Sequence, residues 1–256
     1  MKEIIQQVSN SFLEEAQASP RMLEDLAAME KYMSESYDGR TFIELLQNAD
    51  DAEAKTVCVS EIGDAIIVAN DGRAFNENDI ISICRSGASS KKRGNSIGYR
   101  GVGFKSATVI STEIVIYSSD VYFPFSKTLC AETLSVSYDK VPTVRIPFIY
   151  EDDKLPSNIK NELFRLKMAG FNTSFVFLKA NINKFLTELK GFDSSWLLFL
   201  KNVVHVDINM KDVEQKCSLI RKDKSECEKI VTIKESNKSW YIIHDGDIAV
   251  AFLFNP

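Results

Sequence analysis

Histidine is scarce in this sequence of 256 residues, and its five cysteines are scattered. The two histidines and five cysteines do not form the short spacings that zinc sites use. An odd number of dispersed cysteines is typical of reduced thiols, so we expect a cytoplasmic location. No apolar run approaches the roughly 18 residues of a membrane-spanning helix, and the N-terminal residues lack the apolar core of a secretory signal. The sequence therefore predicts no membrane partner.

Hydrophobic residues, in contrast, are plentiful. They make up 45% of the chain and include 16 Phe and 8 Tyr, which excludes disorder as the main state. The formal net charge of −5 argues against a general nucleic-acid coat. The length suits one large domain, or one domain with a smaller appendage.

Hydrophobic periodicity predicts an α+β fold, with helices first, then a mixed sheet, then a small β tail. Helical spacing covers residues 1–36, with a break at Ser19-Pro20, and Thr41 is expected to cap a helix that runs to about Ala54. Asn76 is expected to cap a short helix. Further helices are expected near 101–110, 153–166 and 183–203. Strands are expected at 56–61, 64–70, 112–120, 121–126, 133–139, 144–150 and 171–180, and several more after 203.

The helix after Thr41 carries an acidic and amide stripe formed by Glu44, Asn48 and Asp51. A solvated helix face explains such a stripe in most proteins. Asn48, however, is a poor residue for a helix interior, and no Lys or Arg follows Glu44 or Asn48 four residues later. The alternative is a divalent-cation site, in which Asn48 offers a hard oxygen to Mg²⁺ and Glu44 orients or deprotonates a water.

A polar turn, Asn70-Asp71-Gly72, follows an apolar strand directly. An ordinary β-turn accounts for these residues. They also suit a nucleobase pocket, because a side-chain oxygen at a strand end can accept from an adenine amino group and Gly72 permits close backbone approach. Phe75 would line that pocket or belong to the core.

Residues 85–103 hold five of the eleven glycines, together with several serines, lysines and arginines. Glycines before a helix expose backbone N–H groups to an anion, although a flexible surface loop has the same composition. A P-loop is excluded because Phe104 separates Gly103 from Lys105. A Rossmann motif is excluded because the glycine order is G-x-x-G-x-G.

Together, four segments resemble the motifs of the Bergerat-fold ATPases, the GHKL superfamily of gyrase B, the heat shock protein 90 family, histidine kinases and mismatch-repair ATPases. ELLQNADDA (44–52) is similar to the N-box, and IVANDGRAF (67–75) stands where the D-x-G-x-G box belongs. GYRGVGFKS (98–106) is similar to the second glycine box, and the triplet around Thr173 to the final threonine box. The sequences of these segments are most similar to the sacsin and NO VEIN type within a heat shock protein 90-like group.

This resemblance implies a two-layer α/β sandwich that binds ATP and Mg²⁺. It assigns Glu44 as the general base for water and Asn48 as the Mg²⁺ ligand. It places the backbone of 101–105 at the phosphates and Lys92 in a lid over the nucleotide. The other nucleotide-binding positions that it implies are Asp51, Ala52, Asn70, Asp71, Gly72, Phe75, Gly98, Gly101, Val102, Gly103, Phe104, Lys105 and Thr173.

Two residues depart from the superfamily pattern. Asn70 stands at the position where most members have the adenine-binding Asp, with Asp71 next to it, and Ala74 replaces the second glycine of that box. A neutral amide accepts more weakly from adenine than a carboxylate does. Either Asn70 or Asp71 is then the acceptor.

The expected division of the chain is an N-terminal helical segment (1–36), a Bergerat-type ATP-binding domain (37–205) and a β-rich extension (206–256) that could begin a following domain. The expected function is ATP·Mg²⁺ binding with slow hydrolysis that drives lid closure and a conformational change in a larger protein. The alternatives are a non-catalytic nucleotide sensor or scaffold, and an ATPase of a nucleic-acid repair or defence system. The expected partners are ATP and ADP, further domains of the same chain, and a second copy in a nucleotide-dependent homodimer.

Overall fold

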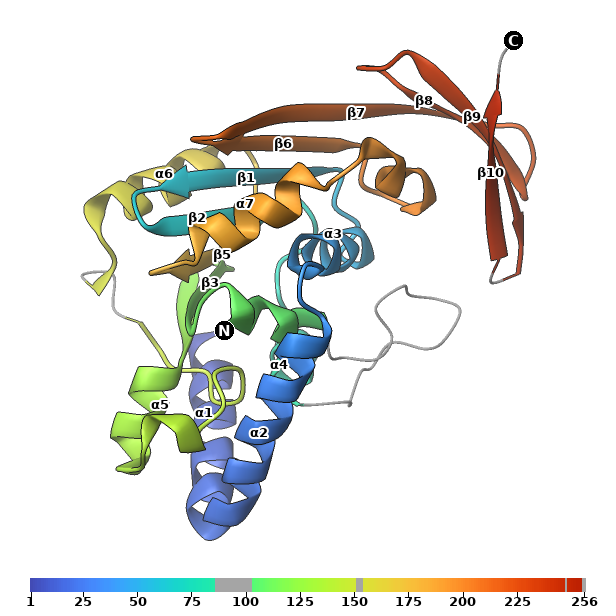
Figure 1. Cartoon of the computed structure of the whole chain (residues 1–256). Helices are drawn as coiled ribbons and strands as arrows, with labels where there is room; N and C mark the ends of the chain where they lie inside the picture. The colour runs from blue at the N-terminus through green and yellow to red at the C-terminus, as the bar shows by residue number, and fades with distance from the viewer. Residues whose placement is uncertain (86–102, 151–153, 247, 255–256) are drawn as a thin grey trace.

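The computed structural model describes residues 1–85, 103–150, 154–246 and 248–254 (Figure 1). Four predicted nucleotide-binding positions, Lys92, Gly98, Gly101 and Val102, lie outside the described residues. The α-helices are α1 (Lys2–Ala18), α2 (Pro20–Ser36), α3 (Thr41–Asp51), α4 (Glu77–Cys84), α5 (Lys127–Leu134), α6 (Ser157–Met168) and α7 (Ile182–Lys190). The 3₁₀ helices are η1 (Gly103–Val109), η2 (Tyr138–Lys140) and η4 (Ser194–Phe199). The strands are β1 (Thr56–Ile62), β2 (Ala65–Asn70), β3 (Glu113–Ser118), β4 (Val121–Ser126), β5 (Thr173–Leu178), β6 (His205–Met210), β7 (Val213–Asp223), β8 (Glu228–Ile233), β9 (Lys238–Asp245) and β10 (Ile248–Phe254).

The described strands form one ten-stranded sheet in the order β10-β9-β8-β7-β6-β1-β2-β5-β3-β4. The sheet is mixed, because β1 and β6 are parallel while the other neighbouring strands are antiparallel. β7 is long enough to join two parts of the sheet, since its first half pairs with β6 and its second half with β8. Figure 1 shows β8, β9 and β10 extending well beyond the helices. The predicted α+β class is confirmed.

Helices cover both faces of the central strands. In β2, Ile67 belongs to a core shared with Leu163 of α6, whereas its neighbour Ile66 belongs to the larger core that includes Leu46 of α3. Successive strand residues point to opposite faces, so a strand buried on both faces must be apolar throughout. This explains why the segment AIIVAN has no polar residue before its last position.

The N-terminal helices form a hairpin below the sheet, as Figure 1 shows. The hairpin turns at Ser19, and Pro20 begins α2, where the missing N–H of proline costs nothing. The predicted break at Ser19-Pro20 is confirmed. α2 packs on η1, so the hairpin contacts the segment that follows the glycine-rich loop.

Local capping chemistry was predicted correctly at one helix and wrongly at another. Asn76 accepts from the backbone N–H of Asp79 at 3.1 Å and completes a capping box, as expected. Thr41, in contrast, does not cap α3, because Arg40 occupies that position. The N–H of Phe42 instead donates to the Glu188 carboxylate of α7 at 2.5 Å. A tertiary contact therefore replaces the cap that the sequence suggested.

Two predicted strands are wrong. Residues 133–139 contain the end of α5 and part of η2, and Ser135 adopts a left-handed conformation with φ of 54°. Residues 144–150 form no strand, although Phe148 donates to the Pro124 carbonyl at 2.9 Å. Pro147 lacks an N–H, which limits a regular ladder here.

The predicted helix near 101–110 is the 3₁₀ helix η1 over its described part, and α6 begins four residues later than the expected 153. Among the helices of the described residues, none is long and apolar enough to cross a membrane.

Candidate functional site

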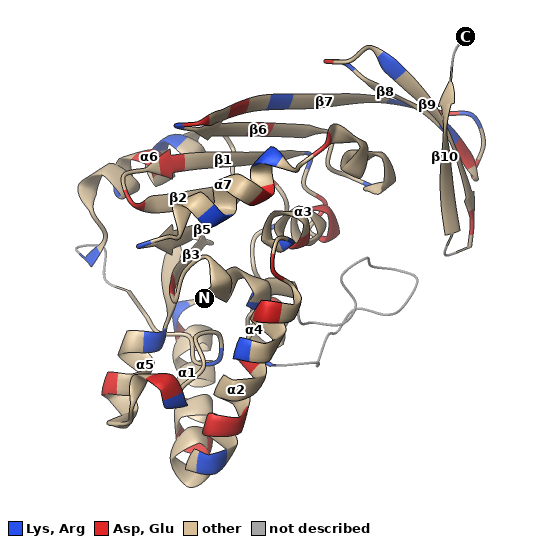
Figure 2. Cartoon of the chain, viewed as in Figure 1, with Lys and Arg blue, Asp and Glu red and all other residues tan. Residues whose placement is uncertain are grey.

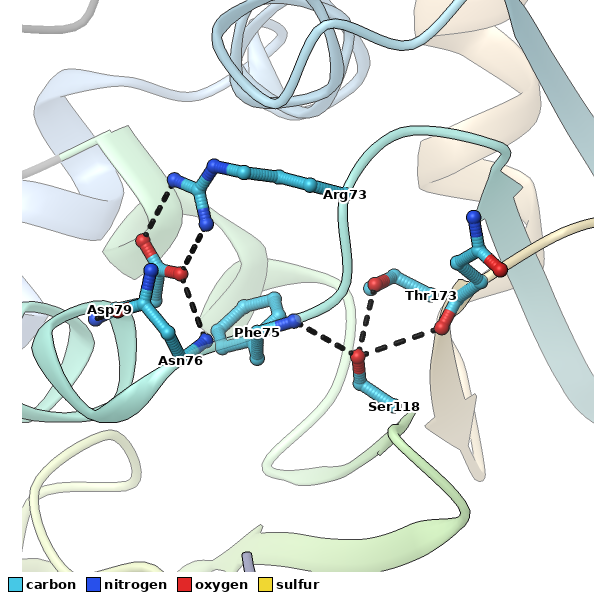
Figure 3. Close-up of polar contacts among 7 residues, drawn as sticks. Arg73, Phe75, Asn76, Asp79, Ser118 and Thr173 are labelled. Carbon is cyan, nitrogen blue, oxygen red and sulfur yellow. Dashed lines mark hydrogen bonds and ion pairs between the residues drawn. The ribbon is translucent and has the colours of Figure 1, made fainter.

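Three polar side chains lie in a row across the ends of three neighbouring strands. Asn70 of β2 is opposite Thr173 of β5, and Thr173 is opposite Ser118 of β3. All three are buried, and the hydroxyl oxygens of Ser118 and Thr173 are 3.0 Å apart, within hydrogen-bonding distance (Figure 3). Polar groups held in place in this way can fix the orientation of a small ligand.

The loop after β2 separates the two candidate adenine acceptors. The Asn70 Oδ1 accepts from the Gly72 N–H at 3.1 Å and stays in the row. The Asp71 Oδ1 accepts from the N–H groups of Lys55 and Thr56, at 2.7 and 2.9 Å. The Asp71 carboxylate is therefore bonded to the start of β1, whereas Asn70 lies beside Thr173.

Gly72 lies against the C-terminal end of α3. A Cβ at Gly72 would come within 2.5 Å of the Ala52 carbonyl oxygen and 3.0 Å of the Ala54 nitrogen. The next residue, Arg73, donates its N–H to the same Ala52 carbonyl at 2.8 Å. Only glycine fits this approach, which brings the loop after β2 against the end of the helix that carries Asp51.

The segment between β2 and α4 is held by polar contacts that Figure 3 draws together. The Arg73 guanidinium binds both oxygens of Asp79, the residue that closes the capping box of α4. The N–H of Phe75 donates to the Ser118 hydroxyl at 3.0 Å. These contacts anchor the backbone of Phe75 beside the polar row.

Aromatic rings lie next to the row. The Phe75 ring contacts those of Phe123 and Phe175, with centroids 5.8 and 6.1 Å apart, and Phe104 contacts Phe175 at 5.3 Å. Phe75 and Phe104 are only partly buried, so they are the members of this group that a ligand could reach. The predicted positions Phe75, Phe104 and Thr173 thus come from three separate segments and lie around one region of the sheet.

Glu44 brings α3 into contact with the glycine box. Its side chain is buried, and a Cβ on Gly103 would lie 1.9 Å from the Glu44 Oε2. The carboxylate therefore lies directly against the backbone of Gly103. Asn48 follows Glu44 by one helical turn, and its amide oxygen is a hard donor of the kind that Mg²⁺ takes. The missing side chain of Gly103 leaves room for the Glu44 carboxylate, and the side-chain oxygens of Glu44 and Asn48 are of the kind that Mg²⁺ takes as ligands.

Lys105 follows the glycine box, but its side chain has other partners. Its Nζ donates to the Val144 carbonyl at 2.6 Å and lies 3.9 Å from the Glu30 carboxylate. Burial lowers the pKa of this amine, and the nearby Glu30 opposes that effect. The backbone of Lys105 therefore lies in η1 close to Gly103, while its ammonium group contacts Val144 and Glu30.

Sequence reasoning assigned no role to three residues of this region. Ser118 stands at the end of a correctly predicted strand, yet only the pairing of β3 with β5 brings it to Thr173. The Asn172 side chain donates to the carbonyls of Asp71 and Gly72 at 3.1 and 2.9 Å, and its place before Thr173 was the available signal. Glu30 lies far away in the sequence and carried no signal.

Comparison with known proteins agrees with this geometry. Residues 39–148 match the family model described as histidine kinase-, DNA gyrase B- and HSP90-like ATPase. Protein NO VEIN of Arabidopsis thaliana is 27% identical over 224 residues, which is 81% of this chain. The chain spans about 8% of the length of that relative. The family match includes Glu44, Asn70 and Gly103, and its members are ATPases that generally use Mg²⁺. The arrangement of these segments and both comparisons lead to one conclusion: residues 39–148 are similar to the histidine kinase-, DNA gyrase B- and HSP90-like ATPases, and most of the chain is similar to Protein NO VEIN.

Proposed function

We propose that this chain binds ATP with Mg²⁺ between α3, the loop after β2 and η1, and that it hydrolyses ATP slowly. The observation that carries the proposal is the contact of the Glu44 carboxylate with the Gly103 backbone. It places a buried acid against the segment that the superfamily uses for phosphates. The polar row at Asn70 and Thr173 supports the adenine end of the same site.

Adenine recognition is assigned to Asn70 rather than Asp71. An amide oxygen has two lone pairs, so the Asn70 Oδ1 that accepts from Gly72 can also accept from an adenine amino group. The Asp71 carboxylate already holds two N–H groups at the start of β1. Thr173 joins the adenine contacts through its hydroxyl, and Phe75 and Phe104 offer ring surface.

Phosphate binding is assigned to the backbone N–H groups of 103–105, together with those of the preceding glycines. Asn48 would hold the Mg²⁺, which neutralises phosphate charge when it is bound. Glu44 would accept a proton from the attacking water or orient it, in addition to the positioning and charge neutralisation on which phosphoryl transfer mainly depends.

The test is nucleotide binding by calorimetry and phosphate release for the wild type and for Glu44→Gln. We expect the variant to lose phosphate release and to keep nucleotide binding, because the base is not required for affinity. Glu35→Gln, an exposed residue of α2, is the matched control and should retain both. Unchanged phosphate release in Glu44→Gln would contradict the role of Glu44, and a wild type that binds no nucleotide would overturn the site.

A nucleotide sensor or scaffold without turnover is the second candidate, and one contact favours it. A lysine after the glycine box could neutralise phosphate charge, yet the Lys105 ammonium donates to Val144. In this reading nucleotide binding alone changes the shape of a larger protein or promotes a homodimer. Calorimetric binding with no phosphate release at high protein concentration would establish it.

A further inference from the structure

A buried ion pair joins the N-terminal hairpin to the glycine box. Glu30 of α2 accepts from the N–H groups of Thr143 and Val144, at 2.6 and 2.8 Å. Lys105 of η1 donates to the carbonyl of the same Val144, and its Nζ is 3.9 Å from the Glu30 carboxylate. Only 7% of the Glu30 side chain and 3% of the Lys105 side chain are exposed. Water therefore does little to solvate either charge.

Each of these charges depends on the other. A charge withdrawn from water is costly unless it is paired and hydrogen-bonded, and removing one partner leaves the other uncompensated. The lowered pKa of Lys105 reflects that cost, with burial as its main cause and Glu30 acting against it. Glu30 and Lys105 therefore hold one another in place, together with the backbone of Val144.

The same helix provides a contrast. Glu24 of α2 forms an ion pair with Lys140 at 2.9 Å, but the two side chains are 46% and 51% exposed. Exposed pairs of this kind contribute little, because solvent screens them and both side chains lose freedom. α2 thus carries one ion pair that constrains its surroundings and one that does not.

Residues 143–145 connect the pair to the elements on both sides of the glycine-rich segment. Arg145 donates to the Cys84 carbonyl at the end of α4, at 3.1 Å, and binds Glu15 of α1 at 2.8 Å. Lys105 contributes the contact from η1. α4 and η1 are therefore both fixed to residues 143–145 and, through them, to the hairpin.

A short 3₁₀ helix needs such support, because its hydrogen bonds are poorly aligned and it rarely persists alone. Within η1, the Ser106 hydroxyl donates to the Gly103 carbonyl at 2.6 Å. Thr41 of α3 donates to the Ser106 carbonyl at 3.4 Å. On the side of α2, Lys105 adds the hydrogen bond to Val144 and the ion pair with Glu30.

We propose that Glu30 is a positioning residue, which acts through Lys105 to hold the backbone of 103–105 in the orientation that receives nucleotide phosphates. The N-terminal hairpin is thereby coupled to the nucleotide site. This inference rests on the proposed function, since it concerns the same phosphate-binding segment.

The test compares Lys105→Met and Glu30→Gln with the matched controls Lys140→Met and Glu24→Gln. Calorimetry on the full chain measures the affinity for a slowly hydrolysed ATP analogue with Mg²⁺ and for adenosine, at a temperature where circular dichroism shows all variants folded. We expect each test variant to bind the analogue about tenfold more weakly, the equivalent of about one charge-assisted hydrogen bond, with adenosine binding unchanged. The controls should match the wild type.

Losses of equal size for the analogue and adenosine would indicate a general structural role and would overturn the inference, as would unchanged affinity for both. Hydrogen exchange without nucleotide gives an independent readout, in which Lys105→Met should speed exchange at Gly103–Val109 and Lys140→Met should not. A wild type that binds neither ligand would overturn the proposed function. The exchange result would then still decide whether Glu30 and Lys105 hold η1.

Discussion

Strands β2 and β10 have similar apolar sequences and very different surroundings. β2 is AIIVAN and β10 is IAVAFLF. Every residue of β2 is buried, whereas Ile248 and Phe252 of β10 are 67% and 55% exposed. β2 lies between β1 and β5, while β10 is at the edge of the described sheet with β9 on one side. Apolar composition therefore predicts a strand but not the layers that cover it.

The exposed surface of β10 is apolar as well as extended. Figure 2 shows this strand without a Lys, Arg, Asp or Glu along its length, unlike the α1–α2 hairpin. Edge strands of stable monomers usually carry charges or bulges that discourage pairing with other strands. This strand belongs to the extension at 206–256, which from its sequence could begin a following domain.

Removing one phenylalanine ring from the central strands and one from β10 should give the largest difference in the free energy of unfolding. Phe177 of β5 is fully buried opposite Ile66 of β2, so Phe177→Ala should lower the free energy of unfolding by about 3–5 kcal/mol. Phe252→Ala removes the same atoms from an exposed site and should change it by less than about 0.5 kcal/mol. Urea denaturation followed by circular dichroism measures both. Equal losses would show that β10 is covered in solution.

A smaller effect is expected where the central strands meet the C-terminal ones. The Asp50 carboxylate accepts from the N–H groups of Lys201, Asn202 and Val203, just before β6. Asp50→Ala leaves these three donors, of which that of Val203 is buried, without their acceptor and should cost about 2–3 kcal/mol in the same denaturation experiment.

The control for Asp50 is Asp207→Ala in β6, where the exposed carboxylate forms a 3.6 Å ion pair with Lys216. Its loss should cost less than about 0.5 kcal/mol. If Asp207→Ala lowered the free energy of unfolding as much as Asp50→Ala does, the hydrogen bonds of Asp50 would not be a special source of stability.

The smallest effect concerns pH and a side chain in the helix layer over the central strands. Burial raises the pKa of Glu188 to about 7, from 4.5. Between these values the folded protein holds a proton that the unfolded chain has lost, so stability falls as the pH rises. Because the carboxylate is partly exposed, we expect a loss of only about 1–2 kcal/mol between pH 5 and pH 8.

Glu188→Gln should flatten this part of the profile, since Gln does not ionise and still accepts from the Phe42 N–H. Thermal unfolding at several pH values measures the slope. β10 contains no titratable side chain, so Phe252→Ala should leave the slope as it is in the wild type. A wild-type profile that rises from pH 5 to pH 8 would contradict the assignment.

The sequence predicted the elements whose signals are local. The strand pair around Gly63, the proline break before α2 and the Asn76 cap each depend on residues within a few positions, and all three are confirmed. The errors at 133–139 and 144–150 came from alternating apolar residues that pack on the core without joining a ladder. Alternation alone does not show whether a neighbouring strand is present.

The sequence predicted the site residues that belong to recognisable motifs, but it did not predict the residues that contact them. Glu44, Asn70 and Thr173 could be named because their motifs are contiguous in the sequence. Ser118 and Glu30 could not, because strand register and helix packing bring them to the site. The alternative of an ATPase in nucleic-acid repair or defence rested on the basic run around Lys92, which lies outside the described residues.

The continuity of β7 has a mechanical consequence. A single stretch of backbone from Val213 to Asp223 carries hydrogen bonds to β6 at one end and to β8 at the other. β6 in turn pairs with β1, and β1 pairs with β2, the strand that carries Asn70 of the polar row. A pull along the direction of the outer strands would therefore load those ladders in shear. It would reach β1 through the continuous backbone of β7 and the hydrogen bonds that join β7 to β6 and β6 to β1.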